Sequence, residues 1–117
     1  MRIVRAAAVS LALLLAACGE PVPQARSAYV GEWRAEKMQL AITQDGFVNY
    51  VRLHEHGKTT INAPIQRFEG DNFVVGIGPF STTFVVSKPP HLDGSAWKMT
   101  VDGVELVRHS GPSDFNA

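Results

Sequence analysis

The sequence predicts an all-β domain, a small antiparallel meander of about seven or eight strands that closes, or nearly closes, into a barrel. Apolar and polar residues alternate with period 2 through most of the chain after Tyr29, as they do in half-buried strands. The 7 Pro and 10 Gly are spread along the 117 residues and supply many turns. The connections are too short for the crossovers of a parallel sheet, and closure would remove the exposed sheet edges.

The N-terminal segment has the organisation of an export signal. Arg2 and Arg5 give it a basic start, and residues 6–15 contain no charge. This apolar run is too short to span a bilayer and matches the hydrophobic part of a secretory signal peptide, which we expect at residues 1–17. The run ends at Leu15-Ala16-Ala17-Cys18, which holds the single cysteine of the chain.

These four residues resemble the lipobox of bacterial lipoproteins. The resemblance implies cleavage between Ala17 and Cys18 and acylation of Cys18, with the membrane as a partner through this lipid anchor. Several acyl chains on one residue would anchor the protein stably, because a single chain binds only marginally. The alternative is an ordinary cleaved signal with an unpaired cysteine, or a membrane-anchoring helix. Gly19 stands where lipoproteins retained at the inner membrane often carry Asp, so the expected location in the cell envelope is the outer membrane, facing the periplasm.

The mature chain divides into three parts. Residues 18–28 read as the lipidated N-terminus and a flexible tether, because they contain Pro21 and Pro23 and few large apolar side chains. Residues 29–110 form the expected barrel, and 111–117 a loose tail. Without Arg2 and Arg5 the chain keeps 9 basic against 11 acidic residues, and it has no basic patch with interleaved aromatics. We therefore expect no nucleic-acid partner.

Turn signals separate the predicted strands. Asp102-Gly103 is the strongest of them, a two-residue hairpin turn between alternating segments. Pro64 marks an edge or a bulge. Residues 32–37 would suit a short helix by propensity, but the alternation that continues through Ile42 favours a strand. The strands are expected at 37–43, 47–54, 59–63, 65–69, 73–77, 80–86, 97–101 and 104–109.

Gly31-Glu32-Trp33 and Arg108 together resemble the calycin pattern of lipocalins and their relatives. There a G-x-W on the first strand places its Trp at the closed end of the barrel, beneath an Arg from near the last strand. The resemblance implies that Trp33 and Arg108 close the barrel and have no catalytic role. The segments 61–86 and 97–108 are also similar to small proteobacterial lipoproteins, which implies a location and a fold but no activity.

His54 and His56 form the most suggestive metal-binding pair. Side chains two residues apart on a strand point the same way and could share a zinc or copper ion. No third ligand is evident, and we favour solvated histidines at a hairpin tip. We expect no cofactor.

Two segments could contact a partner. Lys88, Pro89, Pro90 and His91 interrupt the alternation and predict a loop over residues 88–94. Residues 79–90, with Phe80 and Phe84, fit either core packing or an apolar edge offered to another molecule.

The sequence places no acid, base and nucleophile on convergent elements, so we expect no catalytic residues and no enzyme. The favoured function is a non-enzymatic binding or structural role as an envelope lipoprotein, with a partner protein or a small apolar ligand. The alternative is an inhibitor of a periplasmic hydrolase such as a lysozyme or a protease, which would insert the 88–94 loop into the active cleft.

Overall fold

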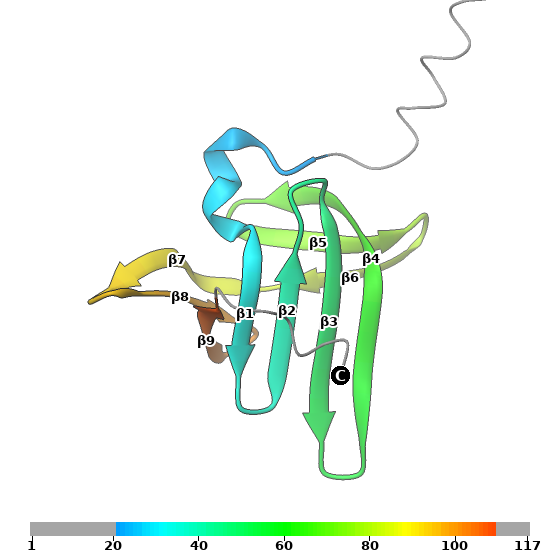
Figure 1. Ribbon diagram of the computed structural model, residues 1–117. Coiled ribbons are helices and arrows are strands. Elements are labelled where there is room, and N and C mark those ends of the chain that lie inside the picture. Colours follow the sequence, from blue (N-terminus) through cyan, green and yellow to red (C-terminus); the bar gives the residue numbers. More distant parts are fainter. Residues whose placement is uncertain (1–20, 110–117) are drawn as a thin grey trace, which may run out of the picture.

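The computed structural model describes residues 21–109, and within that range one antiparallel sheet of nine strands makes up almost the whole domain (Figure 1). The all-β class and the antiparallel meander are therefore confirmed. In the sheet the strands follow the order β6-β5-β4-β3-β2-β1-β9-β8-β7. Their bounds are β1 (Gly31–Ala35), β2 (Met38–Ile42), β3 (Phe47–His54), β4 (Gly57–Glu69), β5 (Asn72–Ile77), β6 (Phe80–Phe84), β7 (Val86–Asp93), β8 (Ala96–Val101) and β9 (Val104–His109).

The expected closed barrel of seven or eight strands is wrong: the nine strands form an open, curled half-barrel. The two edge strands, β6 and β7, are consecutive in the chain and are separated only by Val85. They run on end to end instead of lying side by side (Figure 1). Because strands arranged end to end cannot form a ladder, the sheet stays open along both edges.

Backbone hydrogen bonds of Val85 connect the corner between the edge strands β6 and β7 to the β8–β9 turn. The Val85 N–H donates to Asp102 Oδ1 at 2.9 Å, and its carbonyl accepts from the Asp102 N–H at 2.7 Å. The next N–H, of Val86, donates to Asn72 Oδ1 at 2.8 Å. Asp102 and Gly103 both have positive φ, 49° and 81°, as the predicted Asp-Gly hairpin turn requires. The β8–β9 turn thus also fixes the position of the corner between β6 and β7.

The core fills the concave side of the half-barrel. Successive strands contribute alternate side chains to it, since neighbouring residues of a strand point to opposite faces. Phe73 and Phe84 stack with their ring centroids 5.0 Å apart, and Tyr50 packs edge-on against Phe84. The largest fully buried side chains are Trp33, Phe73, Phe84, Leu40, Ile42, Met99 and Leu106.

The N-terminal segment does not form the expected extended tether over its described part. Val22 is buried, and its N–H donates to the Gln44 carbonyl at 3.0 Å. A 3-10 helix, η3 (Gln24–Tyr29), follows, and the Arg26 guanidinium lies 4.6 Å from the centroid of the Phe68 ring. The chain is therefore packed on the domain from Val22 onward. No helix within residues 21–109 is long and apolar enough to cross a membrane.

Several strand boundaries differ from the expectation. The predicted strand at 80–86 is divided at Val85 into β6 and the start of β7. A turn at Glu36-Lys37 divides the predicted continuous strand into β1 and β2, although the preference for strand over helix is correct. The segments on either side of Pro64 form one strand, β4, whose register shifts only between Ile65 and Arg67. Lys88–His91 lie within β7 and not in a loop. Proline fits there because β7 is an edge strand, on which a missing N–H breaks no ladder.

Candidate functional site

The structure brings Trp33 and Arg108 together, as register partners on β1 and β9. Trp33 is fully buried, and its Nε1 donates to the Tyr29 carbonyl at 2.9 Å. The Arg108 guanidinium lies 5.7 Å from the Trp33 ring and 4.8 Å from the Trp97 ring, so it is held between two indoles. Arg108 also donates to the Ala28 carbonyl at 3.4 Å, so the stack connects β1, β8 and β9 to the end of η3.

The two histidines do not form a metal site with other described residues. His54 ends β3, and its Nε2 lies 2.8 Å from the Thr59 hydroxyl, while His56 occupies the β3–β4 turn. Both side chains are exposed. Among residues 21–109 no group of three or more His, Cys, Asp or Glu side chains is placed to hold a metal ion.

The β7–β8 hairpin projects from the body of the domain (Figure 1). Lys98 Nζ donates to Asp93 Oδ2 at 3.0 Å near its tip, and this bond lowers the pKa of Asp93 and raises that of Lys98. Leu92 of the same tip is 57% exposed. The hairpin therefore exposes Leu92 beside a turn that the Lys98–Asp93 ion pair stabilises.

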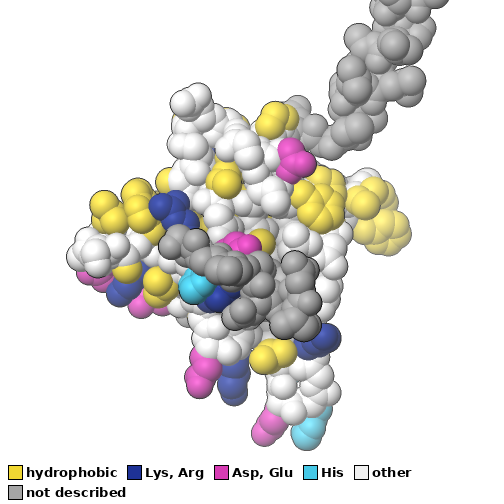
Figure 2. All heavy atoms as spheres, in the orientation of Figure 1, with side chains coloured by type: hydrophobic (Ala, Val, Ile, Leu, Met, Phe, Trp, Pro, Cys, Tyr) yellow, Lys and Arg dark blue, Asp and Glu magenta, His cyan; other side chains and the backbone are white. Residues whose placement is uncertain are grey.

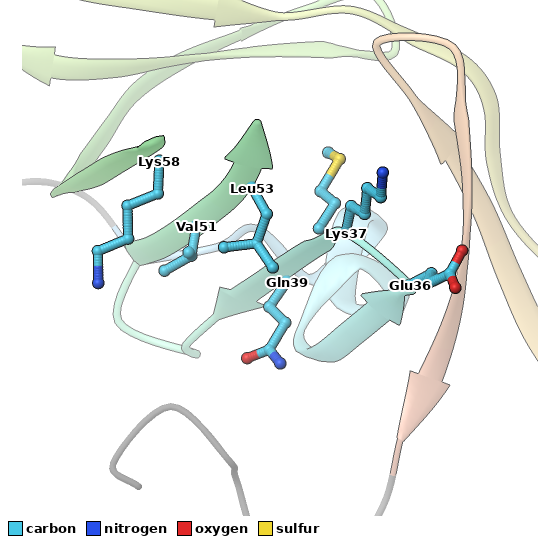
Figure 3. Close-up of a pocket in the computed structure, with 7 residues that line it drawn as sticks. Glu36, Lys37, Gln39, Val51, Leu53 and Lys58 are labelled. Atoms are coloured by element: carbon cyan, nitrogen blue, oxygen red, sulfur yellow. The ribbon is translucent and has the colours of Figure 1, made fainter. Parts of the chain in front are cut away.

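A shallow hollow lies on the convex face between β2 and β3, with a volume of about 180 Å³. Val51 and Leu53 form its floor, with Lys58 at one side and Glu36 and Lys37 at the other (Figure 3). The hollow is smaller than the roughly 300–1,000 Å³ of typical ligand sites. A larger space of about 480 Å³ lies between Pro21–Arg26 and β4, beside the point where the described chain begins.

The strongest candidate is an apolar groove of about 390 Å³ on the concave face of β4, β5 and β6. Phe73 and Val75 of β5 are buried, but Ile77, next on the same face, is 68% exposed. On β6 the exposure rises in the same direction, from buried Phe84 to Phe80, which is 82% exposed. The groove thus continues the core beyond the point at which the half-barrel covers it. Ile61, Ala63, Val75, Ile77, Phe80 and Thr82 line it.

Hydrophobic side chains gather over this part of the surface, at the right of the space-filling view, where the tip of the β5–β6 hairpin lies (Figure 2). A second group lies over β7 and β8 at the left. The sequence drew attention to Phe80 and Phe84 together, but the structure separates them, with Phe84 in the core and Phe80 at the surface. Ile77 was not singled out, since its alternation with Val75 is the same as that of a core residue.

Comparison with known proteins gives no relative: no protein-family model, no curated protein and no solved structure matches the chain.

Proposed function

We propose that the chain is a bacterial envelope lipoprotein that binds an apolar ligand, or an apolar segment of a partner protein, in the groove of β4, β5 and β6. The observation that carries this proposal is the exposure of Ile77 and Phe80 beside a groove of about 390 Å³. Monomeric proteins rarely leave such contiguous apolar surface uncovered unless it is used for binding. The groove contributes apolar contacts and one hydroxyl group, from Thr82, and so provides shape and apolar area rather than reactive groups.

The proposed anchor would hold the domain close to the membrane. Cys18 lies outside the described residues, but Val22 is already packed on the domain. The four peptide links between residues 18 and 22 can span at most about 14 Å when extended. Lipids on Cys18 would therefore place the domain next to the leaflet and not at the end of a long arm.

Replacing Cys18 by Ser tests the anchor. We expect the wild-type protein to sediment with membranes and to carry the mass of the acyl chains, whereas Cys18→Ser lacks that mass and remains in the soluble fraction. Several acyl chains bind a bilayer strongly enough that their loss releases the protein. Equal masses and equal partitioning of the two proteins would contradict the anchor.

Replacing Phe80 by Ser tests the groove. Burial of a phenylalanine contributes about 1.5–3 kcal/mol, so an environment-sensitive naphthalene dye, titrated by fluorescence, should bind at least about tenfold more weakly. Leu92→Ser is the matched control, because Leu92 is also exposed but lies on the β7–β8 hairpin. If both variants bind the dye as the wild type does, the groove is not the binding site.

The β7–β8 hairpin supports a second candidate, inhibition of a periplasmic hydrolase. Its projection and its braced tip suit insertion into a cleft (Figure 1). The same pair of variants separates the two functions. Inhibition of a lysozyme or protease that Leu92→Ser abolishes and Phe80→Ser preserves would assign the activity to the hairpin.

A further inference from the structure

The two edges of the sheet differ in how they are protected against pairing with another strand. On β7, Pro89 and Pro90 lack N–H groups, Lys88 adds a charge, and the pairing with β8 shifts register twice. Such features prevent edge-to-edge association. β6 reads Phe-Ser-Thr-Thr-Phe, with no proline, charge or bulge, and its first four residues are exposed. The β6 edge is open to a further strand.

The hairpin geometry identifies which backbone groups of β6 face outward. Ile77 and Phe80 flank the two-residue turn Gly78-Pro79 and therefore form a hydrogen-bonded pair. Since hydrogen-bonded and non-hydrogen-bonded pairs alternate, Thr82 and Phe84 also bond to β5. The N–H and C=O groups of Ser81 and Thr83 consequently point away from β5. Val85, next in this series, already bonds to Asp102.

The outward N–H and C=O groups of Ser81 and Thr83 allow only one register when two copies of β6 pair antiparallel. Pairing Ser81 with itself would place Thr83 opposite Pro79, which has no N–H to donate. Pairing Thr83 with itself would place Ser81 opposite Val85, whose N–H and carbonyl are occupied. Pairing Ser81 of each copy with Thr83 of the other uses all the free groups and gives four backbone hydrogen bonds. The two-fold axis then passes between the two Thr82 residues.

The side chains fit the same register. On the concave side, Phe80 of each copy faces Phe84 of the other. On the convex side, Ser81 faces Thr83, so aromatic side chains lie opposite aromatic ones and hydroxyl side chains opposite hydroxyl ones. The strand reads almost the same in both directions and carries no charge to repel its copy. We propose that a second copy of this chain docks on β6 in this register, which joins the two half-barrels into one continuous sheet with one concave trough.

Charge substitutions on the convex side test the partner and the register together. In S81K/T83K each new lysine lies opposite a lysine of the other copy, and like charges directly opposite destabilise a sheet pair. In S81K/T83E each lysine lies opposite a glutamate. Sedimentation equilibrium of the full chain in density-matched detergent should show a wild-type dimer, at least tenfold weaker association for S81K/T83K, and recovery of the dimer for S81K/T83E. Circular dichroism verifies that both variants fold.

Three results would overturn the proposal: a wild-type chain that stays monomeric at every concentration, a S81K/T83K variant that still dimerises, or a S81K/T83E variant that does not. The substituted side chains lie on the face opposite Phe80, so dye binding by the groove is measured independently in the same proteins. A monomer that still binds the dye rules out the second copy and leaves the proposed function standing.

Discussion

Replacing Trp33 by Ala is expected to destabilise the chain by about 3–5 kcal/mol, the cost of emptying a large aromatic site in a packed core. The indole is fully buried and lies beneath Arg108, and its Nε1 donates to the Tyr29 carbonyl at 2.9 Å. Its removal leaves both a cavity and an unsatisfied carbonyl at the end of η3. Because small domains have total stabilities of about 5–15 kcal/mol, the variant should unfold at a melting temperature lower by about 15 °C or more.

Urea and thermal unfolding followed by circular dichroism measure this change without depending on tryptophan fluorescence. Trp97→Ala is the matched control, since Trp97 packs on the other side of Arg108 but is only half-buried. It should cost about 1–2 kcal/mol, in proportion to the smaller apolar area removed from contact. If the two variants lost the same free energy of unfolding, the buried Trp33 would contribute no more to stability than the half-buried Trp97.

Local sequence patterns predicted the strands and one of the turns well. The β8–β9 hairpin follows from Asp102-Gly103 between alternating residues, and both residues adopt the positive φ that such a turn needs. Trp33 and Arg108, which the sequence analysis paired, are register partners in contact, but the strands that carry them are not part of a closed barrel. Each of these features depends on neighbours in sequence or on one specific residue pair.

The open edge could not be predicted in this way because it depends on the direction in which β7 leaves β6. Val85 sets that direction through bonds to Asp102, and Val86 through a bond to Asn72, residues distant in the sequence. No periodicity encodes such a corner. The pair Pro89-Pro90 predicts a loop because proline has no N–H to donate, whereas on an edge strand the lost donors are tolerated.

The sequence left open whether the segment with Phe80 packs in the core or forms an apolar edge, for a related reason. Alternation shows that Val75 and Ile77 share a face, but it does not show how far along the strand that face is covered. Coverage depends on the curl of the whole sheet, which leaves Val75 buried and Ile77 exposed two residues later. The same ambiguity applies to Phe84 and Phe80 on the neighbouring strand.

Replacing Gly76 by Ala is expected to separate β5 from β6 and to remove the groove. Gly76 has φ of 155°, and a Cβ atom there would overlap the Phe80 carbonyl oxygen and lie 2.6 Å from Ser81 Cα. Both are backbone atoms of the paired strand, so no side-chain rotation relieves the overlap. We expect a loss of about 3 kcal/mol or more, from forced backbone movement and from an unfavourable φ.

Gly78→Ala separates these two causes, because Gly78 also has a positive φ, of 58°, but nothing lies within 4 Å of its would-be Cβ. It should cost only about 1–2 kcal/mol, the strain of a left-handed conformation. Hydrogen exchange of the β5 and β6 amides and the dye titration measure the result. Since the backbone of β6 forms one wall of the groove and also its open edge, Gly76→Ala should lose both dye binding and self-association, whereas Gly78→Ala keeps them. Retention of both by Gly76→Ala would mean that the close approach of the two strands at this glycine is not what shapes the groove.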